Sequence, residues 1–194
     1  MARQVDHQRR AGLLDSAADY VIECGLADLS LRPMARELGV TPTTLVHHFG
    51  TKDQLLEAII QRVRERILEA AHIEDRAVAD PYRVIRDAWL WMTSPQHESL
   101  YRLYFEIYGS ALQAPERFQS FLEHVVTDWL AILTDVLERN GASPNSATNQ
   151  ATLAVAVVRG LLLDHLTTGD TERVSSAFET FLHVLQAQNR AADG

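Results

Sequence analysis

The chain has 194 residues, of which 46% are hydrophobic and 23% are charged. Such a length fits one domain, or a small domain joined to a larger one, and it is enough to bury a hydrophobic core. Nine glycines and six prolines are too few for a disordered or fibrous chain. We expect no membrane association, because no apolar run approaches the roughly 20 residues that span a bilayer.

The start of the chain has no apolar export signal, and its lone cysteine, Cys24, cannot form an internal disulfide. We therefore expect a cytoplasmic protein in which Cys24 is a small core residue. The net charge is −8. Residues 1–55 contain six basic and seven acidic residues, and the rest of the chain contains twelve basic and nineteen acidic ones. Neither segment is basic enough to bind nucleic acid through charge alone.

Apolar residues recur at steps of three and four through most of the chain, and no segment keeps the two-residue period of a strand. The sequence therefore predicts an all-α fold of about nine helices. Glycine, proline and capping residues indicate where these helices begin and end. The predicted helices cover residues 7–23, 30–38, 42–48, 52–71, 80–92, about 96–112, 115–139, 147–168 and 171–188.

Within residues 31–52, two short predicted helices are joined by a tight turn at Gly39. This length and spacing are typical of a helix-turn-helix, whose second helix enters the major groove of DNA. Thr43, Thr44 and His47 fall on the outer face of the second helix, where short polar side chains can approach base edges. The free N–H groups at the start of that helix can bind a phosphate.

Residues 8–65 resemble the DNA-binding domain of the TetR family of bacterial transcriptional regulators. The shared features are a first helix that ends in a glycine, an L-x-x-x-A-x-x-L-G-V second helix, and T-L-x-x-H-F followed by x-x-K-x-x-L-L. The matching residues are Leu31, Ala35, Leu38, Gly39, Val40, Thr44, Leu45, His48, Phe49, Lys52, Leu55 and Leu56. The resemblance implies a DNA-binding domain over 7–67, with its helix-turn-helix at about 30–49, and an effector-binding and dimerisation domain over 68–194.

By this resemblance, Arg32 contacts a base, and the two threonines in the first turn of the second helix contact bases or phosphates. His48 and Lys52 correspond to phosphate contacts. The family commonly has an aromatic residue, usually tyrosine, at the position of Val46, and a valine there can offer only an apolar contact. The DNA-binding candidates are Arg32, Thr41, Pro42, Thr43, Thr44, Val46, His47, His48 and Lys52.

Aromatic residues are concentrated between positions 89 and 129. At helical spacing they can simply form the core. The resemblance implies instead a mostly apolar effector pocket with a few polar groups, for which His97 and His124 are possible anchors. Both interpretations stay open. The pocket candidates are Trp89, Met92, Tyr104, Tyr108, Trp129 and Arg159.

The last two predicted helices carry more apolar surface than a small chain can cover, and the first of them is apolar nearly all round. This predicts a self-complementary dimer interface. The resemblance implies a four-helix bundle formed with a second copy of the chain. The interface candidates are Val155, Val158, Leu162, Phe178, Phe181 and Leu185.

We expect a homodimeric, ligand-responsive repressor that binds a palindromic operator in double-stranded DNA and leaves it when a small molecule binds. One alternative is a helical protein-interaction adaptor that does not bind DNA. Another is a small helical enzyme, although Arg159, Asp164 and His165 come without a nucleophile or phosphate loop. His47 and His48 point about 100° apart on a helix and would share a metal ion poorly. The sequence predicts no catalytic residue, metal site or cofactor.

Overall fold

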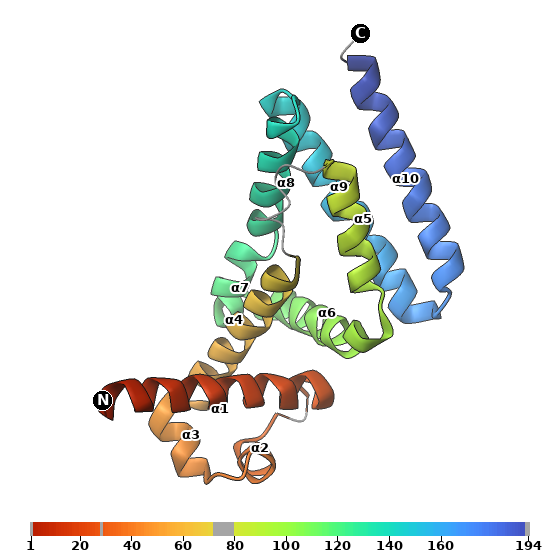
Figure 1. Ribbon diagram of the computed structural model, residues 1–194. Helices are drawn as coiled ribbons and strands as arrows, with labels where there is room; N and C mark the ends of the chain where they lie inside the picture. The colour runs from red at the N-terminus through yellow and green to blue at the C-terminus, as the bar shows by residue number, and fades with distance from the viewer. Residues whose placement is uncertain (1, 28, 72–79, 193–194) are drawn as a thin grey trace. The chain divides into compact units, whose positions relative to one another are not determined.

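The structure of the chain, a computed structural model, describes residues 2–27, 29–71 and 80–192. Within these ranges it is built from helices and contains no strand (Figure 1), so the predicted all-α fold is confirmed. The helices are α1 (Ala2–Cys24), α2 (Leu31–Glu37), α3 (Pro42–Phe49), α4 (Lys52–Ala71), α5 (Pro81–Met92), η2 (Pro95–His97), α6 (Glu98–Gln113), η3 (Pro115–Phe118), α7 (Gln119–His124), α8 (Thr127–Arg139), α9 (Pro144–Thr168) and α10 (Thr171–Ala192).

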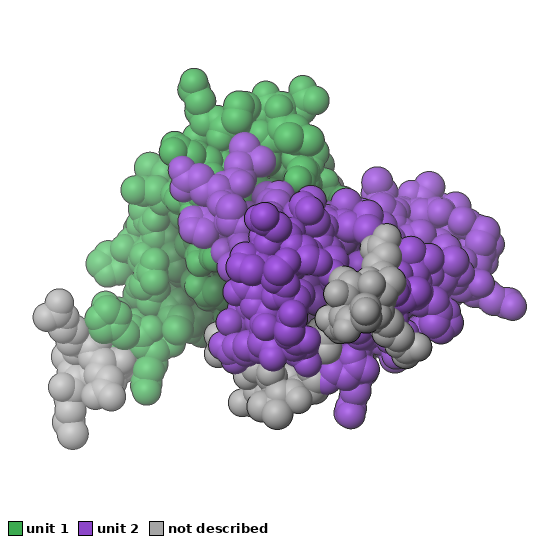
Figure 2. All heavy atoms as spheres, turned by 90° about the horizontal axis from the view of Figure 1, so that it is seen from above, with its two compact units in different colours: residues 1–70, 99–121 green, residues 71–98, 122–194 purple. Residues whose placement is uncertain are grey.

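The chain divides into two compact units, which are coloured separately in Figure 2. Unit 1 contains residues 1–70 and 99–121, and unit 2 contains residues 71–98 and 122–194. Most of α6 therefore packs with the N-terminal helices, although the sequence places it in the predicted effector-binding domain. The division by function into 7–67 and the remainder stays a prediction.

Two contacts attach residues 99–121 to the N-terminal helices of unit 1. Glu106 of α6 accepts hydrogen bonds from the backbone N–H groups of Leu26, at 2.9 Å, and Ala27, at 3.1 Å. Arg117 of η3 donates to Asp53 in the first turn of α4, with 2.7 Å between Nη2 and Oδ1. These bonds join segments that lie between 64 and 80 positions apart in the sequence.

Helix α1 buries its small apolar face and is joined to α4 by an ion pair. Arg62 of α4 donates from Nε to Oδ1 of Asp15 at 2.6 Å, and this bond holds the pKa of the Asp15 carboxyl below its ordinary value. Cys24 is exposed, so its prediction as a core residue is wrong: it is the last residue of α1 and lies beyond the buried positions. The residues of α1 that are 0% exposed are Ala17, Ala18 and Val21.

In unit 2, α9 packs against both α8 and α10, and α5 packs against α8. Trp89 of α5 is 1% exposed and stacks on Phe178 of α10, with 4.7 Å between the ring centroids and 10° between the ring planes. The indole N–H of Trp89 donates to Oγ of Ser175 at 3.4 Å. Arg86 donates from Nε and Nη2 to the two carboxylate oxygens of Glu179 at 2.8 and 2.9 Å. Stacking and ion pair together fix α5 against α10.

The prediction of one continuous helix over 115–139 is wrong, because this segment forms η3, α7 and α8 with a turn before α8. Val125, Val126 and Thr127 are three β-branched residues in succession, and such residues lower helix propensity. Arg159 of α9 donates from Nη2 to the carbonyl oxygen of Val125. In one continuous helix, the carbonyl oxygen of Val125 would accept a hydrogen bond from the same helix. Here it accepts a hydrogen bond from α9 instead.

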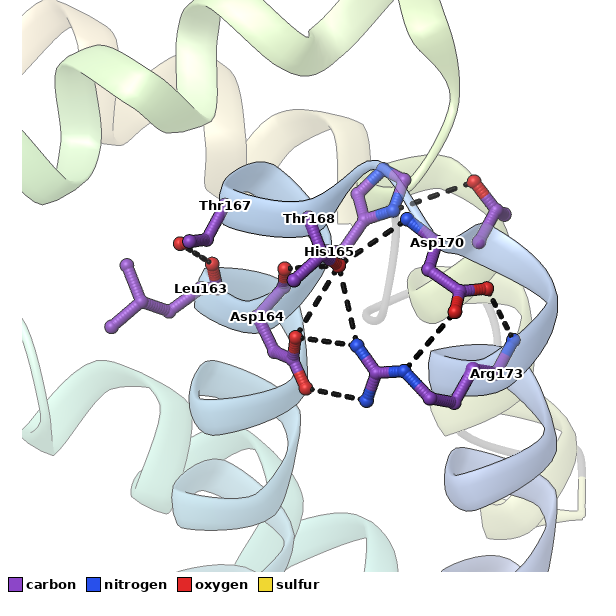
Figure 3. A network of polar contacts seen from close by, with 8 residues as sticks. Leu163, Asp164, His165, Thr167, Thr168, Asp170 and Arg173 are labelled. Carbon is purple, nitrogen blue, oxygen red and sulfur yellow. Dashed lines mark hydrogen bonds and ion pairs between the residues drawn. The ribbon is translucent and has the colours of Figure 1, made fainter.

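The turn between α9 and α10 is held by polar contacts around Arg173 (Figure 3). Its guanidinium donates to both carboxylate oxygens of Asp164, at 2.7 and 2.8 Å, and to Oδ2 of Asp170 at 3.2 Å. Gly169 has a φ of 70°, in the left-handed region that favours glycine, and ends α9. The bonds from Arg173 hold the pKa of the Asp164 carboxyl below its ordinary value.

Helix α9 is the one helix in the described part of the chain that is long and apolar enough, by length and composition, to cross a membrane. A core helix of a soluble protein passes the same test, so this finding is weak evidence for a membrane span. Packing of α9 on α8 and α10 accounts for one part of its apolar surface.

We expect Trp89→Ala to lower the free energy of unfolding by about 3–5 kcal/mol, because it leaves a cavity against Phe178. Trp89→Phe should lose less, since it keeps a ring in the stack. Leu90→Ala is the matched control: Leu90 is 61% exposed, and its truncation should change the stability by less than about 0.5 kcal/mol. Denaturant unfolding measures all three variants. Equal stability of Trp89→Ala and Leu90→Ala would contradict a core role for Trp89.

We expect the stabilising effect of Asp164 to depend on pH. Its pKa is lowered in the folded chain, so the stabilisation is complete above the ordinary value of 3.8 and is lost as the pH falls through the lower folded value. Asp164→Asn should therefore unfold at a lower temperature than the wild type at pH 7, and this difference should shrink below about pH 4. Glu172→Gln, which removes a nearby carboxylate outside the network, is the control. A difference in Tm that stays constant with pH would contradict the assignment.

Candidate nucleic-acid interface

Helices α2 and α3 form the predicted helix-turn-helix, with apolar side chains turned into unit 1. Met34 and Ala35 of α2 and Leu45 of α3 are at most 1% exposed. The turn between the helices is closed by a bond from the N–H of Val40 to the carbonyl oxygen of Ala35, at 2.9 Å. Inward packing of this kind leaves the opposite face of α3 exposed.

The first turn of α3 is capped by Thr41. Its Oγ1 accepts a hydrogen bond from the backbone N–H of Thr44 at 3.1 Å, and the two hydroxyl oxygens lie 2.9 Å apart. An N-cap of this kind stabilises a helix by about 0.5–2 kcal/mol. Both hydroxyls therefore take part in the cap, which uses one of their two O–H donors. Thr43, which is exposed, is the threonine of this turn that carries a hydroxyl outside the cap.

The last turn of α3 is held by α1. Arg10 donates from Nε to the carbonyl oxygen of His48 at 3.2 Å, and its guanidinium lies 5.0 Å from the centroid of the Phe49 ring. A cation at a helix C-terminus is favourable because the partial charge there is negative. The His48 side chain is only 8% exposed, and its Nδ1 lies 3.8 Å from Oδ1 of Asp6. The predicted phosphate contact thus lies mostly buried against α1.

The connection from α3 to α4 is a compact capping box. Thr51 donates its N–H to Oε1 of Gln54 at 2.8 Å, and Gln54 donates its N–H to Oγ1 of Thr51 at 3.2 Å. Gly50 has a φ of 81°, and a Cβ atom there would lie 2.1 Å from Oε1 of Gln54. The arrangement fixes the start of α4, where Lys52 is exposed.

The structure brings most of the DNA-binding candidates to exposed positions. Arg32 is exposed in the first turn of α2 and Lys52 in the first turn of α4. Across residues 2–27, 29–71 and 80–192, neither of these side chains forms an ion pair. The exposed candidates at the start and along the outer face of α3 are Thr41, Pro42, Thr43, Val46 and His47.

Sequence reasoning missed three side chains that position these elements: Arg10, Gln54 and Glu106. Gln54 had a recognisable signal, because threonine followed three residues later by glutamine is a capping-box pattern. Arg10 and Glu106 had no such signal, since their partners lie 38 and up to 80 positions away.

Two family models match this chain. The model for bacterial regulatory proteins of the tetR family matches residues 13–59, and the model for the tetracyclin repressor-like C-terminal domain matches residues 76–187. The second match alone covers more than half of the chain. The chain belongs to the TetR family. Members of this family are DNA-binding transcription factors rather than enzymes.

Known relatives of this TetR-family chain agree with that assignment. It is 33% identical over 81 residues to the HTH-type transcriptional regulator PksA of Bacillus subtilis, which covers 41% of this chain and 38% of that protein. The match spans 36% of the length of the HTH-type transcriptional regulator BetI of Rhizobium meliloti and 60% of that of BetI of Klebsiella pneumoniae. The shared segment is thus a part of those proteins.

Solved structures resemble the chain over most of its length. A transcriptional regulator from Rhodococcus sp. Rha1 has a TM-score of 0.77 at 21% identity, over 92% of this chain and 96% of that one, which shows a common fold. The multidrug binding protein EbrR, in complex with imidazole, has a TM-score of 0.63 at 26% identity, over 92% of this chain and 89% of that one.

The pocket candidates of this TetR-family chain fall into both units. Tyr104 and Tyr108 belong to unit 1, and the other four belong to unit 2. Trp89 lies in the core against Phe178, and Arg159 bonds the Val125 carbonyl, while Met92 and Trp129 are half-buried.

His97, a candidate ligand anchor, and Asp164, considered for catalysis, both form bonds to other residues of the chain. His97 bonds through Nδ1 to the carbonyl oxygen of Trp91 at 2.8 Å. Asp164 pairs with Arg173, and Arg159 bonds the Val125 carbonyl. Among the residues that the structure describes, no three His, Cys, Asp or Glu side chains are grouped to hold a metal ion.

The dimer candidates on α9 and α10 are largely occupied within one chain. Leu162, Phe178 and Leu185 are at most 2% exposed, and Val155 is 9% exposed. Val158 and Phe181 are half-buried. The large apolar side chains that α9 and α10 expose are Leu153, Leu163 and Val184, at 44%, 50% and 51%. The interface stays a prediction, although four of its six candidate side chains are already covered within one chain.

Proposed function

We propose that this chain represses transcription in the cytoplasm by placing α3 in the major groove of a palindromic operator. One observation carries the proposal: α3 is fixed at both ends, and yet its outer face at Thr43, Val46 and His47 is exposed. The match of residues 13–59 to a family of regulatory proteins supports it. A protein-interaction adaptor would need the same hairpin shape but would not bind DNA.

The net charge of −8 is compatible with this proposal if a few exposed side chains and backbone N–H groups make the DNA contacts. Arg32 and Lys52 are exposed at the starts of α2 and α4. The N-terminus of α3 adds backbone N–H groups, although Thr41 already accepts one of them. We therefore assign Arg32, Thr43, Val46 and His47 to base contacts and Lys52 to a phosphate.

We propose that two copies associate through the exposed faces of α9 and α10. Leu153 and Leu163 of α9 and Val184 of α10 are large apolar side chains left in solvent in one chain. Gly160, also exposed, lies between the two leucines in sequence, and a Cβ atom added to it would meet nothing within 4 Å. Contacts within one chain therefore do not require a glycine at this position, whereas close approach by a partner helix would. A two-fold dimer presents two copies of α3, as half-sites about 34–36 Å apart require.

We propose that a partly aromatic small molecule binds at α6 and causes the protein to release the operator. EbrR, a structural relative, has been solved in complex with proflavin. Tyr104 and Tyr108 of α6, with ring centroids 6.1 Å apart, are the proposed contacts in unit 1. Glu106 lies between the two tyrosines in sequence and holds the N–H groups of residues 26–27 before α2. A ligand that shifts α6 would thereby disturb the helix-turn-helix, to the extent that it binds the shifted state more tightly.

The DNA-binding proposal predicts two kinds of effect in binding assays with the DNA upstream of the gene. Arg32→Ala and Thr43→Ala should each weaken binding by about 1–3 kcal/mol and relax the preference at one base position. Lys52→Ala should weaken binding to all sequences and reduce the slope of log affinity against log salt by about one. Arg83→Ala, which removes an exposed arginine of α5, is the control. Full affinity in the triple variant at positions 32, 43 and 52 would refute the proposal.

The dimer proposal predicts that Leu163→Glu and Val184→Glu give folded monomers with weakened operator binding, because each charge would be buried twice across the two-fold axis. Leu90→Glu is the control, since Leu90 is exposed on α5. Sedimentation measures the oligomeric state, and circular dichroism checks the fold. A wild type that sediments as a monomer at micromolar concentration would rule out this interface.

A further inference from the structure

Val46 is an exposed apolar side chain on a helix whose other exposed groups are mostly polar. It is 47% exposed. Within the described residues, the other large apolar side chains that are exposed lie outside the helix-turn-helix, on α5, α6, α9 and α10: Leu90, Leu112, Leu153, Leu163 and Val184. A single exposed valine is ordinary on a protein surface. Its position on α3 is what gives this one significance.

The surroundings of Val46 limit what this part of α3 can recognise. Pro42 and Thr43 precede it by four and three residues, so all three lie on one side of the helix. The ring carbons of the proline and the methyl group of the threonine extend the apolar surface. The hydroxyls of Thr41 and Thr44 are paired with each other at 2.9 Å, which uses one of their two O–H donors inside the protein.

A valine side chain has no atom that can bond a phosphate or the donors and acceptors of a base. The major groove presents one apolar group, the C5 methyl of thymine. We propose that Val46 packs on a thymine methyl in each operator half-site and so makes that position specific for T·A pairs. This inference rests on the proposed DNA-binding function. It adds the base and the atom that the centre of α3 recognises.

Deoxyuridine tests this contact directly, because it pairs as thymidine does but lacks the C5 methyl. The probe is a duplex enriched by the wild-type chain from a random library, with each thymidine replaced in turn by deoxyuridine at symmetric positions of both half-sites. Losing one buried methyl should lower the affinity about fourfold per half-site, and about tenfold or more for the pair. We expect such a loss at one symmetric pair of positions.

The Val46→Ala variant, combined with the replacement of thymidine by deoxyuridine, completes a double-mutant cycle. It should bind the thymidine duplex about as weakly as the wild type binds the deoxyuridine duplex, and it should no longer distinguish the two. Thr43→Ser, which removes the neighbouring methyl and keeps the hydroxyl, is the matched control and should keep the discrimination. Unchanged thermal unfolding of the variants verifies that they are folded.

The outcomes separate the two proposals. If the enriched duplex binds but no position responds to deoxyuridine, the Val46 inference is overturned and the DNA-binding function stands. The inference is also overturned if Val46→Ala keeps the full discrimination, or if Thr43→Ser loses it, because another methyl then makes the contact. If no duplex is enriched at all, the proposed DNA-binding function fails, and the inference fails with it.

Discussion

Helix α3 has to be held firmly while one of its sides stays uncovered, and the bonds at its two ends meet this constraint. Thr41 caps the start, and Arg10 of α1 bonds the carbonyl of His48 at the end. Eight residues make a helix too short to be stable alone. With both ends fixed, the middle of α3 needs no contacts on its outer side, and Val46 can stay exposed there.

The same constraint explains why residues distant in sequence belong to unit 1. The connection after α1 has backbone N–H groups that no helix pairs, and Glu106 of α6 supplies the acceptor for two of them. Arg117 likewise fixes η3 to the first turn of α4. A segment matched by the C-terminal family model is therefore part of the body that carries the helix-turn-helix. The proposed path from effector to DNA through α6 therefore runs within one compact unit.

The sequence predicted the fold class and most helix ends, because glycine, proline and threonine act locally. Gly39 and Thr41 lie at helix ends as expected. The sequence did not predict the break before α8. This break depends on the hydrogen bond from Arg159 to the Val125 carbonyl oxygen as well as on the low helix propensity of the local residues. The interface prediction on α9 and α10 has a related limit: periodicity shows that a helix has apolar sides but not which side its own chain covers, and Leu162, Phe178 and Leu185 are covered by this chain itself.

The sequence contains one lysine, Lys52, and the structure exposes it at the start of α4. All seventeen other basic side chains are arginines, which amine-directed reagents and acetyltransferases leave untouched. Any modification of a lysine side chain in this protein must therefore occur at this position. Acetylation would remove one positive charge per subunit, together with the ammonium group that carries it. A modification specific for lysine side chains would thus address the start of α4, which is the end of that helix proposed to face DNA.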